Sequence, residues 1–258
     1  MAVEASATLV PGLVSVTFRA LNAVEVLSAA VRCGLRGIEW GGDIHVPHGD
    51  TETAKAVGEA TREAGLGVVC YGSYFRAGHS EQEGLSFDSV LASARALGAP
   101  VIRIWAGTRA SSQADAAYRD WVARECRRVA ERAGGEGLRV ALEFHAGTLT
   151  DDLDSTLKLL AEADQPALRT LWQPRHGTGL SDRLNDLRHL APFLEHVHVF
   201  HWPDGKQRLP LAEGAALWQP CFEALRGGGR DVPVLLEFVP GDEPAILERE
   251  AQALQSWL

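Results

Sequence analysis

The chain has 258 residues, 46% of them hydrophobic and 23% charged, which is typical of a folded globular protein and excludes disordered, collagen-like and coiled-coil classes. Acidic residues outnumber basic ones by 34 to 25, and the net charge of −9 disfavours nucleic acid or an anionic membrane as a partner. The sequence lacks an apolar run near the roughly 20 residues that span a bilayer, a basic signal-peptide start and any C-x-x-C pair. We therefore expect a cytoplasmic protein.

A unit of strand, helix and glycine turn repeats along the chain. Gly34 and Gly98 follow helical segments and precede short β-rich runs, as expected where a left-handed glycine ends a helix. Asn22, with Glu25 three residues later, resembles a capping box at the first helix, and Asp115 lies at the opening of a later one. The predicted strands, in chain order, are residues 13–18, 37–40, 67–71, 101–105, 139–143, 168–173, 195–200 and 233–238.

Eight strands, each followed by a helical pattern, predict one (β/α)8 TIM barrel that takes up residues 1–258 as a single domain. Each unit has about 32 residues, an ordinary length for a βα repeat. A doubly wound open sheet is the alternative. It is disfavoured because residues 16–20 after the first predicted strand, Val-Thr-Phe-Arg-Ala, contain no glycine-rich phosphate fingerprint.

Polar side chains gather at the carboxyl ends of the predicted strands, where barrels of this type carry their active sites. Residues two apart in a strand share a face. Because Val140 and Leu142 suit the apolar helix layer, Glu143 should face the barrel interior, and the same alternation turns Phe238 toward the helices. By this argument the inward polar residues are Glu39, Arg103, Glu143, Gln173, His198 and Glu237.

Burying this many polar groups without partners would cost several kcal/mol each, so they need a shared metal ion or a polar substrate. A purely structural network, in which Arg103 bridges Glu39 and Glu237, is the alternative. Trp105 points inward from the same strand as Arg103 and offers a flat ring on which a sugar can stack. His145 is expected to be a loop residue and not a metal ligand.

At these residues the chain resembles the sugar phosphate isomerase/epimerase family, the xylose isomerase-like barrels. The resemblance covers nearly the whole chain. Its most distinctive stretches are Ser15-Val16-Thr17-Phe18-Arg19, the segment 37–47 from Gly-Ile-Glu-Trp to Val-Pro, Leu142-Glu143-Phe144-His145 and His196-Val197-His198-Val199.

The resemblance implies one divalent metal ion held by residues of the last four strands. Carried over to this chain, its ligands are Glu143, Gln173, His198 and Glu237. The family has an aspartate where this chain has Gln173, and an amide adds no negative charge, so we expect weaker metal binding here. The mixed donor set suits Mn²⁺, Mg²⁺, Co²⁺ or Zn²⁺ without choosing between them. His176 resembles the family's substrate-binding histidine.

The favoured hypothesis is a metal-dependent isomerase or epimerase of a sugar or sugar phosphate. Glu143 and Glu237 would move a carbon-bound proton through an enediolate, and a metal-assisted hydride shift stays open. The expected substrate contacts are Glu39, His45, Tyr71, Arg103, Trp105, His176, His201 and Arg208. We expect a small-molecule sugar as partner, with neither nucleic acid nor membrane, and leave a homodimer open.

Three other hypotheses remain. A keto-polyol dehydratase, acting for example on an inosose, would use the same base and metal, with His201 or His45 as general acid for the departing hydroxyl. A non-catalytic sugar-binding relative is kept open by Gln173. An apurinic endonuclease-type phosphodiesterase is disfavoured by the acidic net charge and by the limited ligand set.

Overall fold

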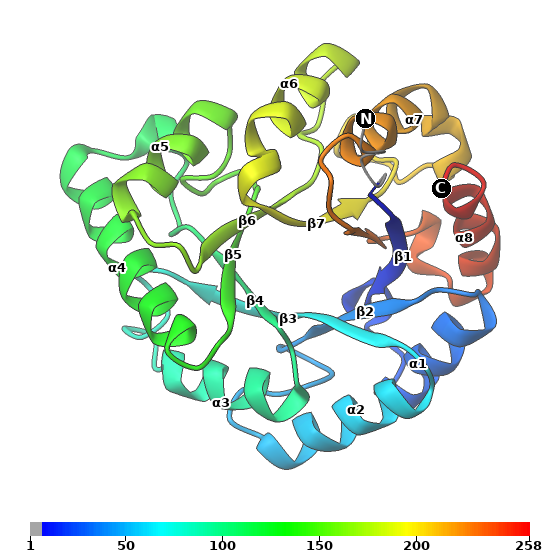
Figure 1. Cartoon of the computed structure of the whole chain (residues 1–258), viewed down its shortest axis with the longest axis horizontal. Coiled ribbons are helices and arrows are strands. Elements are labelled where there is room, and N and C mark those ends of the chain that lie inside the picture. Colours follow the sequence, from blue (N-terminus) through cyan, green and yellow to red (C-terminus); the bar gives the residue numbers. More distant parts are fainter. Residues whose placement is uncertain (1–6) are drawn as a thin grey trace, which may run out of the picture.

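The computed structural model describes residues 7–258. Within that range, eight parallel strands close into a barrel in chain order, with β1 hydrogen-bonded to β8 (Figure 1). The strands are β1 (Leu9–Val14), β2 (Gly37–Gly41), β3 (Gly67–Arg76), β4 (Val101–Trp105), β5 (Arg139–Glu143), β6 (Leu168–Trp172), β7 (Leu194–Val199) and β8 (Val232–Leu236). The surrounding helices are α1 (Ala23–Arg32), α2 (Thr51–Glu63), α3 (Phe87–Leu97), α4 (Ala116–Gly134), α5 (Leu153–Ala163), α6 (Leu180–Leu190), α7 (Ala215–Arg226) and α8 (Leu247–Gln255). The predicted barrel is confirmed, and the closed sheet excludes the open-sheet alternative.

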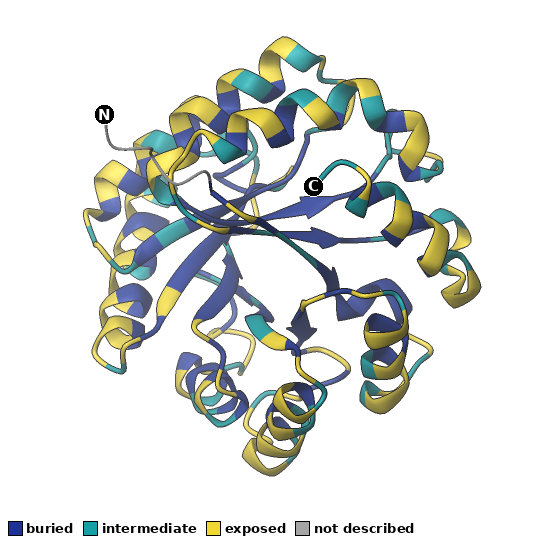
Figure 2. Cartoon of the chain, turned by 45° about the vertical axis from the view of Figure 1, so that its right-hand side comes forward, coloured by how far each residue is buried: buried dark blue, intermediate teal, exposed yellow. Residues whose placement is uncertain are grey.

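The helices cover the barrel with their buried sides toward the strands, as the colours of Figure 2 show. α4 begins after Asp115, whose carboxylate accepts a hydrogen bond from the Tyr118 backbone N–H at 2.8 Å, and it buries Cys126 on its inner face. The predicted capping box of Asn22 and Glu25 is present at α1. Among residues 7–258 we find no helix that is both long and apolar enough to span a bilayer.

Successive side chains of each strand point alternately to the helix layer and to the barrel interior, and this alternation decides where the polar side chains point. Ile104 and Leu142 lie in the large core between strands and helices. Ala141, on the opposite face of β5, packs with Cys70 and Val101 inside the barrel. Since Glu143 lies two residues after Ala141, it faces the interior at the carboxyl end of β5, as the alternation predicts.

The first strand differs from its prediction. Residues 13–18 were expected to form it, but β1 spans Leu9–Val14 and Ser15–Phe18 form a 3₁₀ turn. Side-chain oxygens explain the turn, because Ser15 Oγ accepts from the Gly41 N–H at 2.9 Å and Thr17 Oγ1 from the Phe238 N–H at 3.0 Å. The turn thereby ties the end of β1 to β2 and to the chain just after β8.

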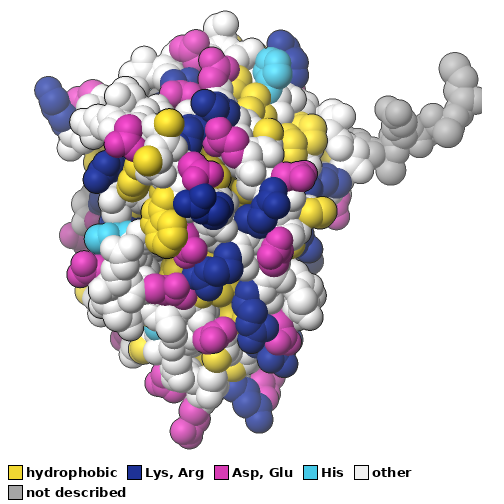
Figure 3. All heavy atoms as spheres, turned by 90° about the vertical axis from the view of Figure 1, so that its left-hand side faces the viewer, with side chains coloured by type: hydrophobic (Ala, Val, Ile, Leu, Met, Phe, Trp, Pro, Cys, Tyr) yellow, Lys and Arg dark blue, Asp and Glu magenta, His cyan; other side chains and the backbone are white. Residues whose placement is uncertain are grey.

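The outer face formed by α4 and α5 carries intermixed acidic and basic side chains (Figure 3). Arg119 pairs with Glu162 at 2.7 Å, and Arg128 pairs with Glu81 at 2.7 Å. The Arg128–Glu81 pair is exposed, and such pairs contribute little to stability. Their effect is to alternate opposite charges over this face.

All four cysteines are free thiols, and they differ in exposure. Cys70, Cys126 and Cys221 are buried, whereas Cys33 is half-buried. Burial raises the pKa of every one of these thiols, to about 12 for Cys126 and about 11 for Cys221. The thiolate, which is the reactive form, is therefore disfavoured at each position.

Candidate active site

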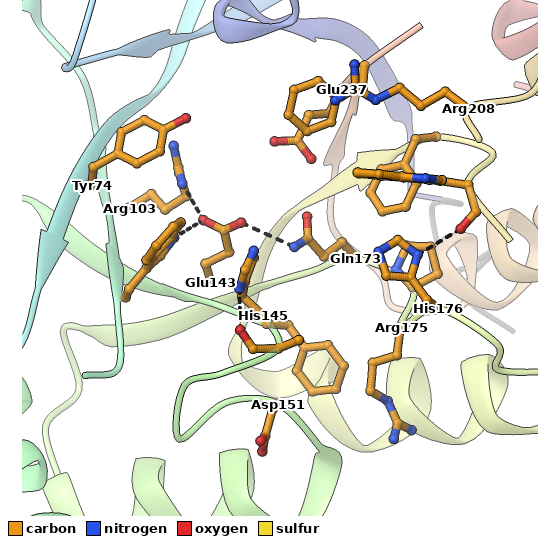
Figure 4. Close-up of a pocket in the computed structure, with 17 residues that line it drawn as sticks. Tyr74, Arg103, Glu143, His145, Asp151, Gln173, Arg175, His176, Arg208 and Glu237 are labelled. Carbon is orange, nitrogen blue, oxygen red and sulfur yellow. Dashed lines mark hydrogen bonds and ion pairs between the residues drawn. The ribbon is translucent and has the colours of Figure 1, made fainter. Parts of the chain in front are cut away.

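A cavity of about 500 Å³ opens at the carboxyl ends of the strands (Figure 4). Its walls are largely aromatic, and charged groups project into it from β4 to β8 and the loops that follow them. The expected site residues in its lining are Arg103, Trp105, Glu143, Gln173, His176, Arg208 and Glu237.

Arg103 is the central cation of the site and is almost completely buried. Its Nε donates to Glu39 Oε1 at 2.8 Å, and its Nη1 donates to Glu143 Oε2. Arg103 therefore bridges two glutamates, as the structural-network alternative requires, but the second is Glu143 and not Glu237.

Glu143 has two oxygens in unequal surroundings. Oε2 accepts hydrogen bonds from Arg103 and from Trp105 Nε1, whereas Oε1 has only Gln173 Nε2 at 3.2 Å. Burial alone would raise the pKa of Glu143, but the nearby charges of Arg103 and His198 and the Trp105 hydrogen bond lower it below its usual value. The carboxylate therefore stays ionised, and Oε1 remains available for a further positive partner.

His198 is surrounded by acceptors on both sides of its ring. Nε2 donates to Glu39 Oε2 at 3.0 Å, while Nδ1 lies 3.2 Å from Gln173 Oε1 and 3.3 Å from Glu237 Oε2. Burial would lower the pKa of His198, but the charges of Glu237 and Glu39 raise it to about 10. In this arrangement the ring is an imidazolium that places a positive charge between the carboxylates.

The implied metal fits these residues. Ligand atoms of Glu143, His198 and Glu237 all lie within 4.8 Å of one another, and Gln173 Oε1 points at the same space. Oxygen and imidazole donors with two carboxylates match a hard or borderline divalent cation. Glu143 Oε1, with its single weak contact, supplies the free oxygen that such a cation requires.

Glu39 lies beneath the cavity floor and not in its wall. It is fully buried, and its Oε2 also accepts from His196 Nε2 at 2.9 Å. Burial would raise the pKa of Glu39, but Arg103, His198 and the two histidine hydrogen bonds hold it well below its usual range. Glu39 was expected to contact substrate, but the structure does not bring it to the cavity, because protein groups enclose its side chain.

Three further expected contacts are also kept away from the cavity. His45 is engaged by Ser15 Oγ at 2.9 Å and donates from Nε2 to the Leu21 carbonyl at 3.0 Å. Tyr71 donates to the Val46 carbonyl at 2.9 Å. The third residue, His201, lies against the start of α7. The structure therefore does not bring these three side chains to the substrate space.

His145, expected to be a simple loop residue, lines the cavity beside Glu143. Its ring stacks on Trp105 with centroids 4.8 Å apart, and its Nδ1 donates to the Ala146 carbonyl at 2.6 Å. A carbonyl only accepts, so the neutral ring keeps Nε2 as its basic nitrogen. Its position two residues beyond Glu143, just past the end of β5, is the sequence signal for its place in the cavity wall.

Phe238 does not face the helices, although strand alternation predicted that it would. It lies after the last residue of β8 with φ +58°, so strand alternation no longer applies, and its ring lines the cavity. The guanidinium of Arg208 lies 4.1 Å from this ring and 4.9 Å from that of Trp202, and it pairs with Asp242. His176 donates from Nδ1 to the Trp202 carbonyl at 2.8 Å. The expected contacts His176 and Arg208 thus both line the cavity and both touch Trp202.

The sequence model of the xylose isomerase-like TIM barrel family matches residues 27–257, and the chain belongs to that family. A curated relative, the 3-dehydroshikimate dehydratase of Bacillus anthracis, is 31% identical over 103 residues. That match covers 38% of this chain and only 35% of the relative's length.

Solved structures of the same fold include enzymes of two reaction types. The probable 3-DHS dehydratase involved in petrobactin synthesis from Bacillus anthracis superposes with a TM-score of 0.80 at 21% identity, covering 96% of this chain and 99% of that one. The 3-keto-D-glucoside 4-epimerase of E. coli has a TM-score of 0.72 at 18% identity, with 97% and 99% covered. At these identities the likeness concerns the fold.

Proposed function

We propose that this protein is a metal-dependent isomerase or epimerase of a sugar or sugar phosphate. The observation that carries the proposal is the pair of carboxylates Glu143 and Glu237. They reach one cavity from the ends of β5 and β8 (Figure 4). Both have an oxygen close to the His198 ring. Two carboxylates that approach one substrate from different strands can remove a carbon-bound proton and return one.

Glu143, Gln173, His198 and Glu237 would hold one divalent cation, with Mn²⁺, Mg²⁺, Co²⁺ and Zn²⁺ all compatible with the donor set. When bound, such an ion supplies Lewis acidity to neighbouring carbonyl and hydroxyl oxygens of the substrate. Its ligands are buried, so water is largely kept from the reacting atoms.

The two carboxylates have different roles in this proposal. Within the described residues, the Glu237 carboxylate has one ion-pair contact, with His198, whereas Glu143 is anchored by Arg103 and Trp105. Glu237 therefore takes the proton from the carbon next to the carbonyl, and an enediolate forms. Glu143, which is ionised at rest, takes a proton from solvent and passes it to the second face or to the adjacent carbon.

The outer part of the cavity would orient the substrate. Trp202 offers a ring for a sugar, and Trp105 offers only its edge because His145 and Arg76 cover its faces. His176 and Arg208 offer polar groups for hydroxyls or a phosphate. His176 and Arg208 contact Trp202 and Asp242 and not the two glutamates, so they can select the substrate without taking part in proton transfer.

Turnover in D₂O of a panel of pentuloses and hexuloses, free and phosphorylated, tests the proposal. We expect deuterium at the carbon beside the carbonyl, because a carboxylate exchanges its proton with solvent unless the closed site shields it. Glu143→Gln and Glu237→Gln should each lower turnover by at least about 10²-fold. Glu195→Gln is the matched control, since Glu195 is also buried but is held by Arg139 at 2.8 Å and Arg169 at 3.1 Å, apart from the cavity.

The outcomes separate the alternatives. Retained turnover in both single variants rejects proton transfer by these carboxylates. Turnover lost in both variants, together with product free of deuterium from the wild type, favours a hydride shift. Binding of the sugars without any turnover points to a sugar-binding protein.

A dehydratase is the second candidate, favoured by the sequence match to a 3-dehydroshikimate dehydratase and by the position of His145. After proton removal beside a carbonyl, a hydroxyl on the next carbon leaves as water once a general acid protonates it. His145 takes the role expected of His201 or His45, because it lines the cavity and they do not. Loss of one water in the product mass, with the absorbance of an unsaturated ketone, distinguishes this reaction from isomerisation.

A further inference from the structure

Glu39 joins three charged or polar side chains of the barrel interior. Its Oε1 accepts from Arg103 Nε at 2.8 Å, and its Oε2 accepts from His196 Nε2 at 2.9 Å and from His198 Nε2 at 3.0 Å. All four side chains are buried. A buried charged network of this kind is a poor way to gain stability, because desolvation offsets the attraction between charges. A task other than stability therefore accounts better for this network.

The contact with His198 determines which ring nitrogen faces the cavity. Nε2 donates downward to Glu39, so Nδ1 points at Gln173 and Glu237. A cation that binds Nδ1 replaces the proton there and leaves the remaining proton on Nε2. Glu39 is the acceptor for that proton, and such an acceptor orients a histidine ligand and makes it more basic.

The contact with Arg103 acts on the opposite ligand. Arg103 binds Glu39 through Nε and Glu143 Oε2 through Nη1 of the same rigid guanidinium. The position of Glu39 therefore fixes Arg103, which in turn engages Oε2 of Glu143 and leaves Oε1 for the cation.

The backbone of β3 leaves room for this arrangement at Gly72. A Cβ atom there would lie 2.7 Å from Glu39 Oε1 and 2.6 Å from Arg103 Nη2, closer than any side chain tolerates. The glycine thus permits the pair to pack directly against the strand.

We propose that Glu39 is a positioning residue that orients two metal ligands at once, His198 directly and Glu143 through Arg103. The inference rests on the metal site of the proposed function. It replaces the expected contact of Glu39 with substrate by a role in metal binding beneath the cavity.

Glu39→Gln tests this role with little change in shape. Arg103 only donates, so the amide oxygen must face it, and the amide NH₂ then faces Nε2 of both histidines. His198 is forced to accept at Nε2 and to keep its proton on Nδ1, where the cation should bind. Calorimetry with Mn²⁺ should show a dissociation constant about 10- to 100-fold higher than in the wild type. The visible spectrum of the Co²⁺-loaded protein should change as well.

Glu195→Gln is again the matched control, because it removes a buried charge between Arg139 and Arg169 without touching a ligand. Its Mn²⁺ affinity should equal that of the wild type. His198→Ala should abolish binding at the site. If His198→Ala loses the metal while Glu39→Gln binds it as tightly as the wild type, the positioning role is overturned and the metal site stands. If the wild type binds no divalent ion, both are overturned.

A measurement on the unmodified protein covers the case in which Glu39→Gln does not fold. Imidazole ¹⁵N spectra of the Zn²⁺-loaded wild type should assign a metal-bound Nδ1 and a protonated Nε2 to His198. A metal-bound Nε2 would overturn the inference, because that nitrogen could not then donate to Glu39.

Discussion

Gln173 lies between Glu143 and His198, where the resemblance to the family implies an aspartate. We expect Gln173→Asp to tighten Mn²⁺ binding by at least about 10-fold, since a carboxylate nearly in contact with the ion adds Coulomb attraction that an amide lacks. Without metal the same change should lower the melting temperature, because it adds a third carboxylate beside Glu143 and Glu237. Calorimetry and thermal unfolding with and without Mn²⁺ measure the two effects.

Gln173→Asn is the control for that substitution, because it shortens the side chain equally without adding charge. Equal or weaker Mn²⁺ affinity in Gln173→Asp than in the wild type would mean that the side chain does not face the ion.

His145 provides a second test at the level of single residues. His145→Phe keeps a ring to stack on Trp105 but removes the basic Nε2. If His145 is the general acid of a dehydration, turnover should fall by about 10²-fold or more while KM changes little. Steady-state kinetics decide the point, and unchanged turnover in His145→Phe would exclude His145 from proton transfer.

The site was predictable from the sequence only in part. Alternation along the short strands places Arg103 and Glu143 inward, because their apolar neighbours in the same strands must face the helices. Depth along the barrel axis was not predictable, so Glu39 was expected at the mouth although it lies beneath the floor. Phe238 lies past the end of β8, where alternation no longer applies, so its cavity contact came only from the three-dimensional arrangement. His145 lies two residues beyond Glu143, and this spacing could have indicated its place in the cavity.

The side chain of Asp115 stabilises α4 as its N-cap. Asp115→Ala removes the acceptor of the Tyr118 N–H and a negative charge at the helix start, so it should cost about 1 kcal/mol of unfolding free energy. Asp120→Ala, within the same helix, breaks only an exposed pair with Arg124 and should cost less than about 0.5 kcal/mol. Urea unfolding of the two variants provides the comparison, and equal losses would argue against the cap.

Most elements followed from local patterns, and the exception has a clear cause. Capping residues and glycine turns marked the ends of several helices, and β-rich runs located six of the other strands to within two residues. β3 continues five residues past its predicted end at Tyr71. The predicted range of β1 begins too late because the pair Pro11-Gly12 is typical of a turn. In the structure Gly12 belongs to the strand, and it allows close packing where a Cβ atom would lie 2.6 Å from the Gly37 carbonyl oxygen. The apolar run of residues 13–18 predicts a strand, but the hydroxyl groups of Ser15 and Thr17 bind the chain at neighbouring strand ends instead.

The proposed metal ligands come from the last four strands, so the site exists only when the barrel is closed. Metal binding should therefore stabilise the whole fold. At a free Mn²⁺ concentration of 100 times the dissociation constant we expect a gain of about 2.7 kcal/mol. As the Mn²⁺ concentration increases, the melting temperature of the wild type should rise and that of His198→Ala should stay constant. A constant melting temperature in the wild type, at concentrations where calorimetry shows binding, would place the ion elsewhere.

Because three thiols are buried, the rate at which they are alkylated reports how often the barrel opens. Cys70 lies inside the barrel, while Cys126 and Cys221 are buried residues of α4 and α7. A reagent therefore reaches each thiol only when its surroundings separate. In native buffer we expect Cys33 to react first and the other three only at the rate set by transient unfolding. Mass spectrometry of the timed products would then resolve whether the two halves of the barrel open together or one after the other.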